Sequence, residues 1–174
     1  EGALQAARAD KSGHVSPSNP LAVVFATGIE GVREVMRFAH THHIPVVTRG
    51  GGSGLAGGAI GQSGEIVLSL ERMNHILEIS VEDRLARVQA GVINSDLLAA
   101  AGEHGLWFAP DPASRQWSTV GGNIATNAGG LLCAKYGVTR ESVLELTVVL
   151  ADGRLIRTGH RSVKGVTGFD LTGL

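Results

Sequence analysis

Two glycine-rich segments constrain this chain more than any other feature. Of its 174 residues, 25 are glycine, roughly twice the usual proportion. The glycines concentrate in RGGGSGLAGG at 49–58 and in STVGGNIATNAGG at 118–130. Glycine has no Cβ, so its backbone adopts positive φ easily and can approach another molecule closely. The clustering predicts backbone that lies directly against a ligand.

Composition and charge exclude several classes of protein. Hydrophobic residues make up 43% and charged residues 18%, a balance that can bury the core of one domain of ordinary size. A net charge of -1 with no basic block argues against nucleic-acid partners or a polybasic membrane surface. Cys133 stands alone and no Cys/His spacing is typical of zinc, so we expect neither a disulfide nor a metal site. No apolar run is long enough for a transmembrane segment.

The hydrophobic pattern predicts short strands mixed with a few helices. Thr27 and Glu30 have the spacing of a capping box, and Asn94 and Gly105 are expected to begin and end a second helix. Asp152-Gly153 predicts a hairpin turn. Strands and helices do not alternate regularly, so the fold class is α+β. The expected strands are 21–26, 46–48, 66–70, 76–81, 85–90, 143–150 and 154–158, and the expected helices are 31–43 and 95–104.

The first cluster contains a formal G-x-G-x-x-G at Gly52, Gly54 and Gly57. A dinucleotide-binding fold of the Rossmann type would need a helix to begin here. Further glycines follow at 58, 61 and 64, and each costs about 1 kcal/mol within a helix. We therefore expect a loop whose N–H groups turn towards an anionic group.

The second cluster alternates small residues with hydroxyl and amide side chains. The stiff segment Ala109–Pro112, APDP, precedes it. A ligand that touches both clusters must be long, and a dinucleotide has that length whereas a single phosphate does not.

Together these motifs resemble the flavin-binding domain of the vanillyl-alcohol oxidase (PCMH-type) superfamily. RGGGSGLAGG, QAGV, APDP and STVGGNIATNAGG are followed in order by KYG, ADG and GFDL. The set is most similar to the branch of glycolate oxidase subunit GlcD and FAD-linked D-lactate dehydrogenase. The resemblance implies two small α+β subdomains at 21–174 after an N-terminal arm at 1–20, incomplete before the substrate-cap domain.

The resemblance also implies which residues bind FAD. The backbone of the first cluster would hold the pyrophosphate, and the second cluster with its preceding segment would line the remainder. The implied residues are Gly50, Gly51, Gly52, Ser53, Gly54, Leu55, Pro110, Asp111, Ser118, Thr119, Gly121, Gly122, Asn123, Thr126, Asn127, Gly129 and Gly130.

Two departures qualify what the resemblance implies. Members with covalent flavin in the first loop carry histidine where Ser53 stands, so non-covalent FAD is expected. No cap domain is recognised, so the catalytic residues stay unassigned. We expect the chain alone to be inactive and to hold FAD weakly, because part of the flavin cradle would be missing.

The implied function is oxidation of a D-2-hydroxy acid of the glycolate or D-lactate type by hydride transfer to flavin. Electrons would leave to a quinone, an electron-transfer protein or partner subunits, and the location would be cytoplasmic or peripheral at the inner membrane. Two alternatives are a non-catalytic flavin-binding subunit of a larger complex and an enzyme similar to alkyl-dihydroxyacetonephosphate synthase. The specific acid, the acceptor and the oligomeric state stay open.

A few other residues carry weaker expectations. His40, His42 and His43 are expected to be exposed at the end of the first helix. Trp107 and Trp117 are expected to anchor the core. Cys133 is expected to pack rather than react.

Overall fold

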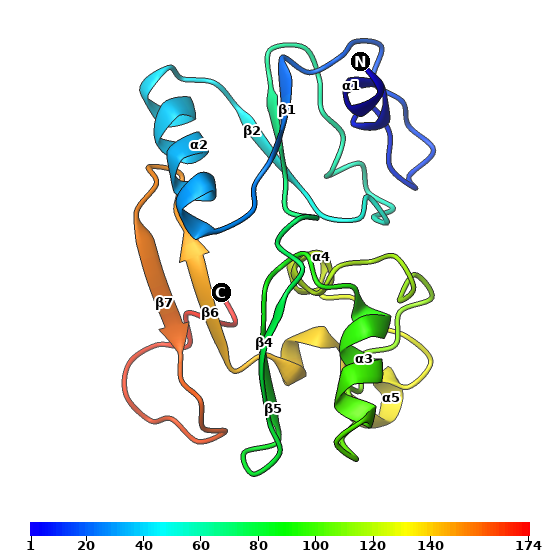
Figure 1. Ribbon diagram of the computed structural model, residues 1–174, viewed down its shortest axis with the longest axis vertical. Helices are drawn as coiled ribbons and strands as arrows, with labels where there is room; N and C mark the ends of the chain where they lie inside the picture. The colour runs from blue at the N-terminus through cyan, green and yellow to red at the C-terminus, as the bar shows by residue number, and fades with distance from the viewer.

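The computed structural model describes residues 1–174 and contains three separate sheets (Figure 1). The helices are α1 Gly2–Ala6, α2 Ile29–Thr41, α3 Asn94–Gly102, α4 Val120–Thr126 and α5 Cys133–Tyr136, with a 3₁₀ turn η1 at Thr139–Ser142. The strands are β1 Ala22–Phe25, β2 Val46–Arg49, β3 Ile66–Ser69, β4 Ile76–Ser80, β5 Leu85–Val88, β6 Glu145–Val149 and β7 Leu155–Gly159.

The first sheet is parallel, with β3 between β1 and β2. All four residues of β3 are buried, as expected for the central strand of a covered sheet. Helix α2 connects β1 to β2, and its apolar residues Val32, Val35 and Met36 pack on a core of Ala26, Leu68 and Met73. We call β1–β3 with α1 and α2 the upper lobe. The predicted amphipathic helix and its buried face are confirmed.

The lower lobe consists of the antiparallel β4–β5 hairpin with α3, α4 and α5, below the upper lobe in Figure 1. It has its own core of Val92, Leu97 and Val120, on which partly buried Phe108 and Ile124 pack. Two separate cores agree with the expected pair of small α+β subdomains. The β6–β7 hairpin forms the third sheet and contacts α2, where Arg33 Nε donates to the Gly153 carbonyl at 3.2 Å.

Both predicted helix caps are wrong. Helix α2 begins after Gly28 with no side-chain cap, and Glu30 pairs with Arg33 instead of closing a capping box on Thr27. Helix α3 begins after Ile93, so Asn94 is its first residue, and its buried side chain bonds elsewhere. The expected stop at Gly105 is confirmed by a φ of +69° just beyond the helix.

The tryptophans are not core anchors, contrary to expectation. Trp107 is 50% exposed and Trp117 is 45% exposed. Trp107 lies edge-on to Tyr136 with ring centroids 4.7 Å apart.

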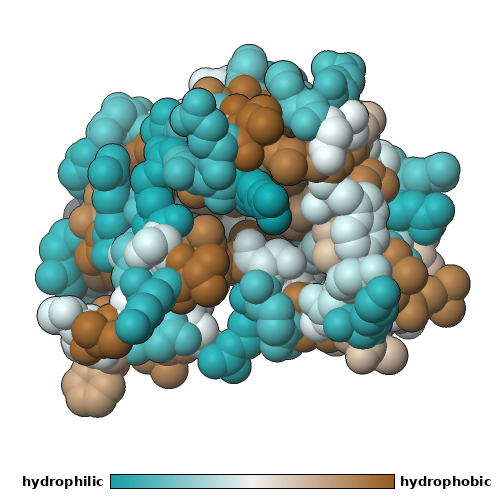
Figure 2. Space-filling view, turned by 90° about the horizontal axis from the view of Figure 1, so that it is seen from below, coloured by the Kyte–Doolittle hydropathy of each residue, from teal (hydrophilic) through white to brown (hydrophobic).

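His40, His42 and His43 are exposed as predicted. Figure 2 shows apolar side chains scattered among polar ones on the lower face.

Candidate functional site

The first glycine-rich segment is the connection between the parallel strands β2 and β3. Such neighbours require a crossover of a dozen or more residues, usually a helix. Here residues 50–65 make the connection without any helix, as the glycine content predicts. We call residues 50–58 the glycine loop. It starts at the carboxyl end of β2, the end at which open parallel sheets bind ligands.

The backbone N–H groups of the glycine loop are free. None of the nine amides from Gly50 to Gly58 donates a hydrogen bond to any protein group. Most backbone N–H groups in folded proteins are paired with protein or water. A run of unpaired donors on glycine-rich backbone matches the anion-binding concavity that the sequence predicts.

The other glycine-rich segment packs directly on this loop. A Cβ on Gly50 would collide with Thr119 Oγ1, and one on Gly51 would collide with the Trp117 carbonyl. We expected a ligand to bridge two separate walls. Instead the protein joins them itself, because glycine lets the two backbones meet, and together they form one surface.

The second segment is more regular than expected and satisfies most of its own hydrogen bonds. Thr119 accepts the Gly122 N–H at 3.1 Å and thereby caps α4. The helix ends at Asn127, which has a φ of +48° and whose Oδ1 accepts the Arg140 N–H at 3.0 Å. The N–H groups of Gly129 and Gly130, beyond the helix, have no protein partner.

The predicted cofactor residues therefore divide into two sets. Pro110, Ser118, Thr119 and Asn123 are buried, and they support the surface from within. Asp111 also supports it, because its Oδ1 accepts the Leu132 N–H at 3.2 Å and its backbone lies against Gly130. The other set is at least partly exposed in the glycine loop, in α4 and just beyond it: Gly50, Gly51, Gly52, Ser53, Gly54, Leu55, Gly121, Gly122, Thr126, Asn127, Gly129 and Gly130.

Asn94 is a supporting residue that the sequence assigned to a different role. Its side chain is fully buried, and its Nδ2 donates to the Pro110 carbonyl at 3.2 Å. Its backbone N–H donates to the Ser118 carbonyl at 3.0 Å. One residue thus ties α3 to the segment at Pro110 and to the first residue of the second glycine segment.

Arg49 and Asp10 lie beside the glycine loop. Burial lowers the pKa of Arg49, although the carboxylates of Asp10 and Glu71 oppose this effect. Burial by itself would raise the pKa of Asp10. Hydrogen bonds from Ser12 and the Ala59 backbone, together with the positive charge of Arg49, hold that pKa below its ordinary value. Asp10 is therefore a carboxylate at neutral pH.

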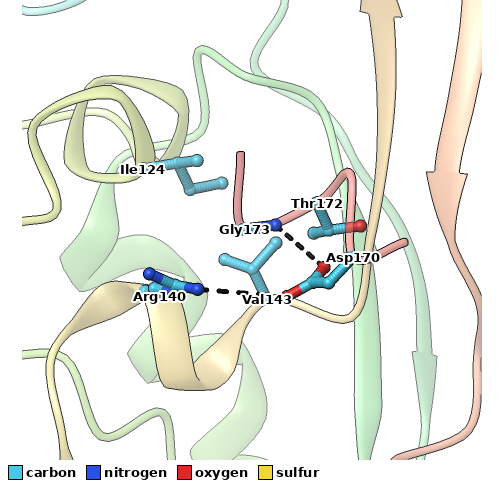
Figure 3. Close-up of a pocket in the computed structure, with 6 residues that line it drawn as sticks. All are labelled: Ile124, Arg140, Val143, Asp170, Thr172 and Gly173. Atoms are coloured by element: carbon cyan, nitrogen blue, oxygen red, sulfur yellow. Dashed lines mark hydrogen bonds and ion pairs between the residues drawn. The ribbon is translucent and has the colours of Figure 1, made fainter. Parts of the chain in front are cut away.

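Two cavities of the structure lie away from these residues. One, of about 130 Å³, is lined by Ile124, Arg140, Val143, Asp170, Thr172 and Gly173. In Figure 3 Arg140 and Asp170 face each other across it, with 4.0 Å between Nη2 and Oδ2. It is smaller than the roughly 300–1,000 Å³ of typical ligand sites.

The second cavity, of about 530 Å³, lies where Arg161 bonds to Asp83 across the lower lobe. Neither cavity includes a predicted cofactor residue. The free N–H groups locate the site better than cavity size does, because an open surface of backbone donors encloses little volume.

No group of three or more His, Cys, Asp or Glu side chains could hold a metal ion. No helix has the length and apolar character to cross a membrane.

The glycine loop and the second glycine segment form an open surface of backbone N–H donors between the two lobes. Such a surface is typical of a protein that binds a phosphate-bearing cofactor. Residues 20–159 match the family model described as "FAD binding domain". The chain belongs to this family, and its cofactor is FAD.

Curated relatives extend the comparison. The chain is 45% identical over 157 residues to glycolate oxidase subunit GlcD of Bacillus subtilis, covering 90% of this chain and 33% of that protein. It is 44% identical to D-2-hydroxyglutarate dehydrogenase of Xanthomonas citri, covering 87% and 32%. It is 46% identical to D-lactate dehydrogenase of Archaeoglobus fulgidus, covering 86% and 33%. The chain spans about a third of the length of these relatives.

Solved structures share the fold. 6-Hydroxy-D-nicotine oxidase of Arthrobacter nicotinovorans superposes with a TM-score of 0.76 at 26% identity, covering 91% of this chain and 34% of that one. Alkyldihydroxyacetonephosphate synthase superposes with a TM-score of 0.74 at 23% identity, covering 86% and 29%. The latter likeness is one of fold alone.

The residues of the site fit FAD. Two adjacent phosphates need several donors in a row, and the nine unpaired amides of the glycine loop supply them without a lysine. A Cβ on Gly54 would meet nothing within 4 Å, so the loop is open at this position. The glycine loop thus offers both the donors and the access that a pyrophosphate requires.

Proposed function

We propose that the chain is the FAD-binding part of a flavoprotein oxidoreductase that oxidises a D-2-hydroxy acid of the glycolate or D-lactate type. The observation that carries the proposal is the run of free N–H groups at 50–58, fixed against the second glycine segment in an FAD-binding family. The reaction class comes from the names of the relatives, GlcD and the two D-2-hydroxy-acid dehydrogenases.

In this proposal the chain's own residues bind and orient the cofactor. The amides of Gly50–Leu55 hold the pyrophosphate, and the exposed residues Thr126, Asn127, Gly129 and Gly130 line the rest of the cofactor. Flavin, when bound, supplies the acceptor for a hydride. Ser53 has no imidazole with which to form a flavin linkage, so FAD is held non-covalently. Pro110, Asp111, Ser118, Thr119 and Asn123 fix this surface from behind.

No catalytic residue is assigned within these 174 residues. A 2-hydroxy acid needs a cationic group for its carboxylate and a base for its hydroxyl proton. Two cations that follow the second glycine segment are already engaged: Lys135 lies 4.8 Å from the Tyr136 ring centroid, and Arg140 faces Asp170. Electrons would pass to a quinone, an electron-transfer protein or a partner subunit.

The proposal predicts reduction of bound flavin by substrate in the full-length protein. Anaerobic addition of glycolate, D-lactate or D-2-hydroxyglutarate should bleach the visible flavin absorbance, and L-lactate should leave it unchanged. Acid denaturation should release all of the flavin into solution, as expected for non-covalent FAD.

Other results would contradict the proposal. Retained flavin that none of the D-2-hydroxy acids bleaches would favour a non-catalytic subunit or a reaction without net redox change, as for the synthase fold. Flavin that stays with the denatured protein would refute non-covalent binding. Absence of flavin binding would refute the cofactor role itself.

A further inference from the structure

The N-terminal segment packs against the glycine loop. Residues 1–16 contain α1 and a short antiparallel bridge between Ala9 and Val15. The Lys11 N–H donates to the Gly54 carbonyl at 3.1 Å, in the middle of the loop. The Gly61 N–H donates to the Ala7 carbonyl at 2.8 Å, just beyond the end of the loop. We call residues 1–16 the N-terminal brace.

Arg49 connects this brace to both ends of the loop. Its backbone begins the loop, and its Nη1 donates to the Ala59 carbonyl at 2.6 Å at the other end. Its Nη2 donates to the Ala6 carbonyl of α1 at 3.3 Å. The planar fork of a guanidinium can reach two carbonyls at once, which a lysine ammonium on a flexible stem does less well.

Charge also attracts Arg49 towards Asp10 of the brace. Its guanidinium interacts with the carboxylates of Asp10 and Glu71. Asp10 Oδ1 in turn accepts the Ser12 N–H at 2.8 Å, which fixes the carboxylate in the brace. The guanidinium thus has two carbonyl partners and lies in the field of two carboxylates, so it is not left free for an anion.

The loop needs outside support for a physical reason. Six of its nine residues are glycine, and its N–H groups make no hydrogen bonds within the protein. Such a chain loses more conformational entropy on ordering than other sequences do. A binding site that is ordered beforehand avoids this cost when the ligand arrives.

We propose that Arg49 and the N-terminal brace hold the glycine loop in its cofactor-binding conformation before FAD arrives. Arg49 is then a positioning residue, acting through the loop backbone rather than as a ligand of the phosphates. This inference rests on the proposed FAD role of the loop. It adds that residues 1–16, which lie outside the matched family region, set the affinity of the site.

The test is substitution Arg49→Lys, which keeps the charge and removes the fork. Without FAD, hydrogen–deuterium exchange of the Lys11 and Gly61 amides, which bond the brace to the loop and its end, should accelerate about tenfold, the effect of losing one charge-assisted hydrogen bond. Exchange in the buried strand β3 should not change. FAD affinity measured by fluorescence titration should fall by a similar factor. Arg157→Lys, at an exposed arginine with no side-chain partner, should match the wild type in both measurements.

Two outcomes would overturn the proposal. In the first, exchange of the Lys11 and Gly61 amides without FAD stays at the wild-type rate while affinity falls, and Arg49 would then act on the cofactor directly. Equal exchange and equal affinity in the variant would remove any role for the fork. If the wild type fails to bind FAD, the proposed function fails, whereas exchange of the Lys11 and Gly61 amides without FAD still decides whether Arg49 holds the brace on the loop.

Asp10→Asn supplies a second, milder variant with a pH signature. The pKa of Asp10 is lower in the folded protein than its ordinary value, so its carboxylate stabilises the fold above about pH 4 and loses this effect as the pH falls further. The difference in unfolding free energy between wild type and Asp10→Asn should be constant from pH 7 to 5 and should disappear below pH 4. Glu34→Gln, at an exposed carboxylate, is the control. A difference that persists unchanged at pH 3 would contradict the claim that the ionised carboxylate of Asp10 stabilises the brace.

Discussion

Gly51→Ala is expected to destabilise the protein by about 1–3 kcal/mol, the usual cost of forcing an extra methyl group into a packed site. The added Cβ would collide with the Trp117 carbonyl, and its carbonyl carbon would lie 3.2 Å away. Both atoms belong to the backbone, so no side-chain rotation can relieve the clash. Either the glycine loop or the backbone at Trp117, ahead of α4, must move.

Gly54→Ala is the matched control in the same loop. A Cβ there has open space around it and the residue does not need positive φ, so its stability should stay within about 0.5 kcal/mol of wild type. Chemical denaturation of both variants measures the difference. Equal stability of the two variants would show that the two glycine segments are not in contact.

Asn94→Asp is expected to have the larger effect on stability, about 3 kcal/mol or more at neutral pH. The change replaces the amide donor to the Pro110 carbonyl with a carboxylate oxygen at a fully buried position. A buried charge without a partner costs more than a lost neutral hydrogen bond. The melting temperature should fall by roughly 6–12 °C.

Asn74→Asp makes the same chemical change at an exposed residue and should leave the melting temperature nearly unchanged. A thermal unfolding series of wild type and both variants checks the prediction. If Asn94→Asp unfolds at the same temperature as Asn74→Asp, the side chain of Asn94 does not tie α3 to the segment at Pro110.

The sequence predicts most strands and the character of the glycine loop, because both depend on local chemistry. The strand at 66–70 is confirmed as β3, and the turn at Asp152-Gly153 joins β6 and β7. The absence of a helix after Gly54 is also confirmed. Alternating apolar residues and clustered glycines act over a few neighbouring residues, so these patterns can be interpreted without the rest of the chain.

The wrong prediction for Asn94, and two features that the sequence analysis does not foresee, depend on contacts outside the local pattern. Asn94 is of a residue type that often caps helices, but its side chain donates to the carbonyl of Pro110, 16 residues away. Helix α4 forms despite two glycines, because Thr119 caps it and Gly121 packs on Ala90. The contact of the N-terminal brace with Arg49 spans more than 40 residues. The local sequence patterns do not predict these contacts.

The central claim is that FAD lies on the surface formed by the glycine loop and the second glycine segment. The most direct test is hydrogen–deuterium exchange of the protein with and without saturating FAD. The claim predicts slower exchange of the amides at 50–58 and at 129–130 when FAD is present. Protection confined to the cavity at Arg140 and Asp170, or no protection of residues 50–58, would contradict it.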